Sequence, residues 1–223
     1  PYDLDVGLPN PLAPVLAEVI DFDRLPQSPV KLFITATNVH TGRPRVFRNA
    51  DLSPAALMAS ACLPFMFQAV EIDGQAYWDG GYSGNPTMTP LIDECSSDDT
   101  IIVGINPVQR PGVPRSAREI LNRLNEVAFN AVLLKELQMM ALLRSVSDPG
   151  NEKTAHWARM RVHLVQSDLL ATIAASSKLN AEWEFLTMLR DEGRRAAEAF
   201  LAEKGAALGK RSTLPIEYLL EKA

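Results

Sequence analysis

The sequence has few of the residues that mark metal centres, disulfide frameworks or nucleic-acid surfaces. Among 223 residues only two are cysteines, Cys62 and Cys95, and neither has the spacing of a metal or redox motif. The formal net charge is -5 and no basic stripe runs along the chain, so nucleic acid is not an expected partner. Phosphate-cradling motifs are also missing. The sequence therefore predicts reduced thiols, no bound metal and no cofactor.

Long hydrophobic runs are scarce as well. The one uncharged run, residues 52–70, approaches the roughly 20 apolar residues that span a bilayer. Pro54 and Pro64 interrupt it, which favours a buried helix followed by an extended segment. The first ten residues have neither the basic start nor the apolar run of a signal peptide. A cytoplasmic location is therefore expected, and the start at Pro1 suggests a fragment.

The chain has the composition of a globular domain with a sheet covered on both faces. Its hydrophobic content is 47%, and no linker-like stretch divides it, so residues 1–223 are predicted to form a single domain. Continuous apolar runs at 30–37 and 100–105 are typical of buried strands, and alternation predicts a further strand at 160–164. Because helical patterns separate these strands, an α/β fold is expected.

Local signals place the remaining elements. Ser53-Pro54 predicts the start of a helix of small residues that reaches Cys62. Asp73-Gly74 is typical of a type I′ turn between strands at 69–72 and 75–78. Ser116 and Glu119 form a capping-box pattern before a long amphipathic helix that is expected to end near residue 144. Shorter helices are predicted at 14–20 and 87–92, and another long one from about residue 180.

The stretch from Ala76 to Pro86 is the strongest candidate for a functional site. A short apolar strand ends there at Asp79, and three glycines follow within five residues: Gly80, Gly81 and Gly84. Glycines at these positions would permit positive φ angles and close approach of the backbone, which can direct an acidic side chain at a partner. The structural alternative is that Asp79 only caps the turn.

Other candidates for catalytic groups carry less weight. The histidines are His40, His156 and His163, and a structural role is favoured for each because none lies beside a plausible nucleophile in the sequence. The nucleophile motif G-x-S-x-G is absent. Its nearest approach, residues 80–84, has Ser83 one place late, so Ser83 is predicted to be an ordinary loop serine.

Three segments together resemble a known family. They are residues 31–47 with Thr35-Ala36-Thr37-Asn38, the helix end Ser60-Ala61-Cys62-Leu63-Pro64, and Tyr77-Trp78-Asp79-Gly80-Gly81. They resemble the C-terminal part of a patatin-like phospholipase domain of bacterial type, and Asp79-Gly80-Gly81 matches the Asp-Gly-Gly motif of that family. The resemblance is strong from about residue 30 to 106 and looser through the later helices.

The resemblance implies a fold and an activity. The fold is a partial three-layer α/β/α domain with a mostly parallel central sheet and flanking helices. The activity is lipid acyl ester hydrolysis by a Ser-Asp dyad, in which Asp79 is the base and Gly80 and Gly81 fit its loop against the nucleophile turn. The aromatic residues Phe65, Phe67 and Trp78 either keep this site dry or pack in the core.

The nucleophile-bearing segment of the family has no counterpart in this sequence. One explanation is proteolysis, with an N-terminal fragment that stays bound; another is that the segment lies outside the sequence given. The third is a catalytically silent lipid- or protein-binding module. Expected partners are a lipid or acyl ester substrate, an N-terminal fragment of the same protein and, transiently, a membrane surface.

Overall fold

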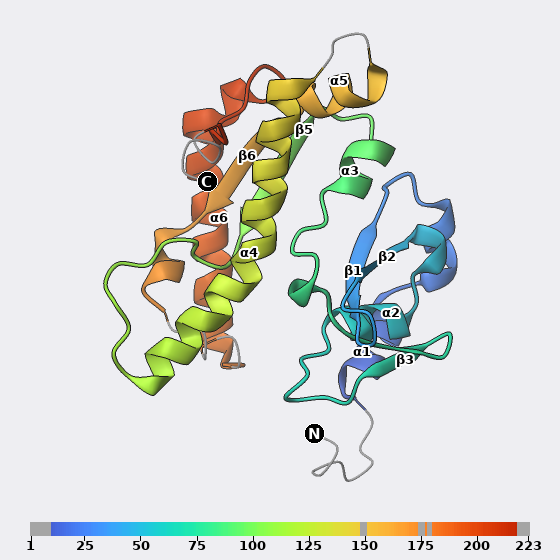
Figure 1. Cartoon of the computed structure of the whole chain (residues 1–223). Coiled ribbons are helices and arrows are strands. Elements are labelled where there is room, and N and C mark those ends of the chain that lie inside the picture. The colour runs from blue at the N-terminus through green and yellow to red at the C-terminus, as the bar shows by residue number, and fades with distance from the viewer. Residues whose placement is uncertain (1–9, 148–150, 174–176, 178–179, 218–223) are drawn as a thin grey trace. The chain divides into compact units, whose positions relative to one another are not determined.

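The computed structural model describes residues 10–147, 151–173, 177 and 180–217, and the chain divides into two compact units, Pro1–Leu91 and Ile92–Ala223. Both contain helices and strands, and the second has a parallel strand pair (Figure 1). The predicted mixed α/β fold with a parallel sheet and flanking helices is thereby confirmed. That all 223 residues form one domain stays a prediction.

The first unit is built on a four-stranded sheet in the order β2-β1-β4-β3. Every neighbouring pair in it is antiparallel; short turns join β1 to β2 and β3 to β4, and β4 pairs with β1 across the intervening elements, while the parallel pairing is in the second unit. The helical elements of this unit come before β1, between β2 and β3, and after β4. The elements are α1 (Leu12–Val19), η1 (Phe22–Gln27), β1 (Phe33–Asn38), β2 (Pro44–Arg48), η2 (Asn49–Asp51), α2 (Pro54–Ser60), β3 (Val70–Ile72), β4 (Gln75–Asp79) and η3 (Gly80–Tyr82).

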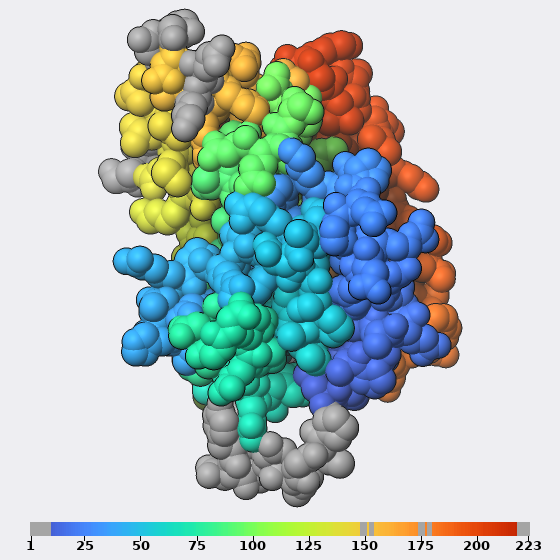
Figure 2. Space-filling model, turned by 90° about the vertical axis from the view of Figure 1, so that its right-hand side faces the viewer, coloured from blue at the N-terminus to red at the C-terminus, as the bar shows by residue number. Residues whose placement is uncertain are grey.

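Helix α2 begins as the sequence predicts. The Ser53 hydroxyl accepts a hydrogen bond from the backbone N–H of Ala56 at 3.2 Å, and Pro54 occupies the first turn. Ala56 and Ala59 are fully buried against the sheet, where their small side chains permit a close approach. Figure 2 shows the surface of this unit, with α1 in blue beside α2 in cyan. The buried core here consists of Ala36, Phe47, Leu52, Ala56, Ala59 and Tyr77.

The turn between β3 and β4 has the predicted type I′ character. Asp73 and Gly74 have φ angles of 54° and 70°, and Ile72 pairs with Gln75 across the two-residue loop. The Asp73 carboxylate also accepts a hydrogen bond from the Arg45 guanidinium at 2.9 Å. Asp73 therefore has a structural role in this hairpin.

The second unit contains the parallel pair of strands, β5 (Asp99–Gly104) and β6 (Arg161–Gln166). The long helix α4 (Ala117–Val146) and α5 (Glu152–Arg159) connect them, since parallel neighbours require a crossover. After β6 the chain forms η4 (Asp168–Ala171), α6 (Trp183–Lys204) and η6 (Gly205–Ala207). The short helix α3 (Thr89–Glu94) spans the boundary between the two units.

The capping box of α4 is confirmed. Ser116 Oγ accepts from the Glu119 backbone N–H at 3.2 Å, and the Glu119 carboxylate accepts from the Ser116 backbone N–H at 3.0 Å. The helix ends at Val146, close to the expected boundary. In the described part of the chain, no helix combines the length and apolar character that crossing a bilayer requires.

Candidate active site

Asp79 is the last residue of β4 and stands where the strand becomes the turn η3. Its backbone N–H donates to the carbonyl oxygen of Cys62 at 2.8 Å, and it pairs with Ala36 in the register between β1 and β4. Its Oδ1 atom accepts a hydrogen bond from the Gly81 backbone N–H at 2.7 Å. This carboxylate therefore caps the turn.

Gly80 is required by close approach and not by an unusual backbone angle. A Cβ atom on Gly80 would lie 2.0 Å from the Thr35 carbonyl oxygen, a distance that no side chain tolerates. The positive-φ glycines among the described residues are Gly42, Gly74, Gly112 and Gly209. The expectation of positive φ in the glycine loop was thus wrong, while the expected close backbone contact is present.

Two threonines of β1 organise the loop, although the sequence patterns did not predict them as site residues. Thr37 Oγ1 donates to the Asp79 carbonyl oxygen at 2.8 Å and lies 2.8 Å from Ser83 Oγ. Because the Thr37 proton is committed to Asp79, the Ser83 hydroxyl donates to Thr37. Thr35 Oγ1 lies 3.0 Å from Thr87 Oγ1. The alternate positions 35 and 37 in a strand beside β4 were the available signal.

The hydrogen bonds of Thr37 explain the role of Ser83. Its hydroxyl proton points to Thr37 Oγ1 and not to the Asp79 carboxylate. A nucleophilic serine would need that proton to face a base. Ser83 is therefore held as a structural loop residue, in agreement with its position one place late in the sequence motif.

The charge of Asp79 influences two neighbouring side chains. Burial raises the pKa of the Cys62 thiol, the Val70 backbone lowers it, and the Asp79 charge raises it further. The pKa of Tyr82 is raised first by burial and then by Asp79. Cys62 is buried, and its Sγ donates to the Gln68 carbonyl oxygen at 3.1 Å. The Asp79 carboxylate thus disfavours ionisation of both the Cys62 thiol and the Tyr82 hydroxyl.

The aromatic residues near this site divide into two groups. Phe67 and Trp78 are half-buried, whereas Phe65 is 89% exposed. The prediction that Phe65 packs in the core is therefore wrong. The neighbouring Met66 is 47% exposed, so two large apolar side chains stand together at the surface of the first unit.

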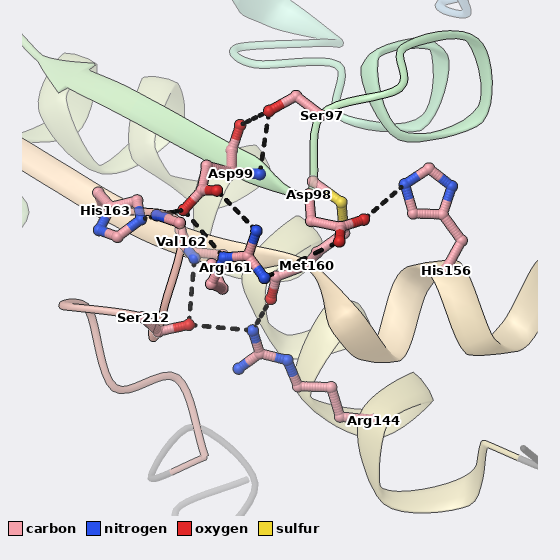
Figure 3. A network of polar contacts seen from close by, with 11 residues as sticks. Ser97, Asp98, Asp99, Arg144, His156, Met160, Arg161, Val162, His163 and Ser212 are labelled. Carbon is pink, nitrogen blue, oxygen red and sulfur yellow. Dashed lines mark hydrogen bonds and ion pairs between the residues drawn. The ribbon is translucent and has the colours of Figure 1, made fainter. Parts of the chain in front are cut away.

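The three histidines lie in different environments, one exposed, one beside a carboxylate and one buried. His40 is exposed at the turn after β1, and His156 Nε2 lies 3.6 Å from an Asp98 carboxylate oxygen. His163 is fully buried, and its Nε2 lies 3.0 Å from Asp99 Oδ1 (Figure 3). Its Nδ1 lies 3.0 Å from Thr213 Oγ1. Both ring nitrogens of His163 are thereby satisfied.

Asp99 is the centre of that second polar cluster. The Arg161 guanidinium binds both carboxylate oxygens, at 3.0 and 2.7 Å, and the Gly209 backbone N–H donates at 3.0 Å. Arg161 is the largest of the influences that hold the pKa of Asp99 well below its usual range. Asp99 and Arg161 are register partners in the parallel pair, so the cluster fastens the first residues of β5 and β6. Within the described ranges, no three carboxylate, histidine or cysteine side chains are placed to hold a metal ion.

Comparison with protein families adds a decisive observation for the first unit. Residues 8–92 match the family model of the patatin-like phospholipases. The match includes Asp79, Gly80 and Gly81 and begins upstream of the segment at residue 30 that carried the resemblance. The first unit is therefore similar in sequence to the patatin-like phospholipases. A comparison with curated proteins found no match.

Proposed function

We propose that this chain supplies the carboxylate half of a Ser-Asp dyad in a lipid acyl ester hydrolase. The observation that supports it is the position of Asp79, which ends a strand inside the segment that matches the patatin-like phospholipases. Gly80, pressed against the Thr35 backbone, and Gly81, which donates to Oδ1, fix the loop around this carboxylate. A fixed carboxylate is what a nucleophile needs as its partner.

The proposed reaction has two stages. A serine Oγ, supplied by a segment outside this sequence, attacks the ester carbonyl carbon while Asp79 takes the serine proton. The proton then passes to the departing alkoxide oxygen as the ester C–O bond breaks, which leaves an acyl-serine. Water attacks the acyl carbonyl, Asp79 takes a proton from it, and the serine leaves as the acid is released with the proton restored to Oγ.

An aspartate is a weak general base, because its ordinary pKa is near 4. Its use therefore depends on a short hydrogen bond to the serine in a partly dry site. Oδ1 already accepts from Gly81, so the carboxylate is oriented before a substrate binds. The chain without the serine segment is accordingly proposed to be inactive.

The test is a pair of matched substitutions in the full gene product. Asp79→Asn should reduce hydrolysis of an acyl ester by at least about 10³-fold, because the amide cannot take the serine proton. Asp73→Asn removes the same charge six residues away, in a turn where asparagine is equally suited, and should leave turnover unchanged. Normal hydrolysis by the Asp79→Asn protein would refute the assignment.

A second candidate function is a catalytically silent lipid- or protein-binding module. The absence of G-x-S-x-G from this sequence favours it. Intact mass spectrometry after treatment with a serine-reactive fluorophosphonate separates the two functions. A labelled second polypeptide in the purified protein supports the dyad and the N-terminal partner, whereas an unlabelled full gene product that binds lipid vesicles supports the module.

The exposed pair Phe65 and Met66 supports a transient contact with a membrane surface. Large apolar side chains at a surface can enter the boundary between lipid headgroups and acyl chains. Such a contact would bring an insoluble acyl ester to the first unit, where Asp79 lies.

A further inference from the structure

A cavity of about 360 Å³ lies within the second unit, at the carboxyl ends of the parallel strands. Gly104 and Gln166, the last residues of β5 and β6, form part of its wall. Ligands of open α/β sheets commonly bind outside this edge of the strands. The volume falls in the range of sites for small molecules. Most of the lining is apolar and includes Val103, Ile105, Val165, Leu170, Ile173 and Leu189.

One arginine holds three parts of the cavity wall together. Arg110 donates to Glu126 of α4 through Nε at 3.1 Å and through Nη2 at 2.6 Å. It also donates to the carbonyl oxygens of Ala171, at the end of η4, and of Ile173, the latter at 3.2 Å. Because these bonds need no ligand, the cavity is formed in advance. A preformed apolar cavity spends little free energy on ordering when it binds.

The polar groups of the lining favour a hydrogen-bond donor over an anion. Glu126 accepts from Arg110 and Arg123, and Glu192 accepts from Arg195 and Ser167. A carboxylate offers about four acceptor positions, and three are used on each of these lining residues, which leaves about one unused on each. The lining contains no lysine, arginine or histidine among its described residues. An anionic ligand would find no cationic side chain in the lining, because the arginines beside it already bind Glu126 and Glu192.

We propose that this cavity binds the hydrocarbon chain of an uncharged amphiphile that ends in a hydroxyl group, such as a fatty alcohol or the glycerol end of a neutral acylglycerol. The chain lies among the apolar side chains, and the hydroxyl donates to Glu126 or Glu192. The proposal does not rest on the proposed hydrolysis, because every residue that lines the cavity belongs to the second unit and Asp79 belongs to the first.

Helix α6 supplies a position that can close the cavity without disturbing the fold. Gly193 lies in the middle of this helix and lines the cavity, and a Cβ atom built on it meets no atom within 4 Å. Glycine is a poor helix former, and nothing in the surrounding packing demands it here. A larger side chain at this position would extend over the cavity.

The experiment is isothermal titration calorimetry on the full chain carrying Asp79→Asn, with 1-hexanol, 1-octanol and 1-decanol as probes. The Asp79→Asn substitution removes turnover if the proposed hydrolysis is correct and leaves the second unit unchanged. Saturable binding is expected, with an affinity that rises up to about fourfold for each methylene that enters the cavity. Octanoate should bind at least about tenfold more weakly than 1-octanol, because its charge would be buried in a mostly apolar lining that contains no cationic side chain.

Two leucine substitutions in α6 locate the binding. Gly193→Leu should abolish 1-octanol binding or weaken it more than tenfold. Ala199→Leu, on the same helix at an exposed position outside the cavity, should leave it unchanged. Binding that does not saturate, equal affinity for octanoate, or equal effects of the two leucines would overturn the proposal. None of these outcomes bears on Asp79, whose own test is ester hydrolysis.

Discussion

The two units stabilise their key residues by different means. In the first unit the loop at Asp79 is held by neutral hydroxyls, backbone N–H groups and a glycine in contact with a neighbouring strand. In the second, arginines bind carboxylates around Asp99, Glu126 and Glu192. The Asp79 loop therefore depends on steric fit and uncharged donors, which salt and pH change little, whereas the three carboxylates of the second unit depend on ion pairs, which both can change.

The largest effect is expected where the steric fit is tightest. Gly80→Ala should lower the free energy of unfolding of the first unit by about 3 kcal/mol, because the new methyl group would overlap the Thr35 carbonyl and force β1 and β4 apart. The measurement is urea unfolding followed by Trp78 fluorescence, with Trp157 and Trp183 of the second unit replaced by phenylalanine.

The control for this prediction is a glycine of the second unit. Gly193→Ala should raise the free energy of unfolding of that unit by about 0.5–1 kcal/mol, because alanine is the better helix former and the site has room. Equal destabilisation by the two alanines would break the proposed contrast between the units.

A smaller loss, of about 2–3 kcal/mol, is expected from Glu126→Gln in the second unit. Glu126 is 4% exposed, and its neutral analogue would leave Arg110 and Arg123 without their counter-charge. Burial opposes ionisation of Glu126, but the two arginines outweigh burial and lower its pKa. The stabilisation is thus complete above the ordinary glutamate pKa of about 4.3 and is lost as pH falls through the lower folded value.

Urea unfolding of both proteins between pH 7 and pH 3, followed by Trp157 and Trp183, checks this prediction. The difference between wild type and Glu126→Gln should be constant above about pH 5.5 and shrink below that. A difference that stays constant to pH 3 would show that Glu126 acts through packing and not through its charge.

The smallest effect tests whether charge also matters in the first unit. Asp79→Asn should lower the pKa of Tyr82, because the aspartate charge is one cause of its raised value. Ultraviolet absorbance of tyrosinate against pH measures this, and the Tyr82→Phe protein identifies the signal of this residue among the four tyrosines. An unchanged Tyr82 pKa would mean that the negative charge of Asp79 does not reach the ring.

The sequence was most informative where a few adjacent residues determine a structure. Asp73-Gly74, the Ser53 cap and the box at Ser116 and Glu119 each act within four positions, and the structure confirms all three. Continuous apolar residues likewise identified β5. In these places local propensity and tertiary structure agree.

Contacts between distant residues were beyond the sequence alone. The Thr37 hydroxyl bonds across 42 positions to Asp79, and Arg110 reaches Ala171 across 61. Gly80 shows most directly what the sequence cannot predict. Its φ angle is not positive, and a glycine is needed only because the Thr35 backbone of the neighbouring strand leaves no room for a side chain. The pairing of β1 with β4 was missed for the same reason, since no short turn joins these two strands.

The pairing of β5 with β6 also has a consequence during synthesis on the ribosome. The β3–β4 hairpin closes over two residues, whereas Asp99 of β5 can pair only after Arg161 of β6, 62 positions later, has been synthesised. At roughly 5–20 residues per second, β5 emerges about 3–12 s before its partner. Through that interval the strand has an open edge, while the loop that holds Asp79 has already been completed.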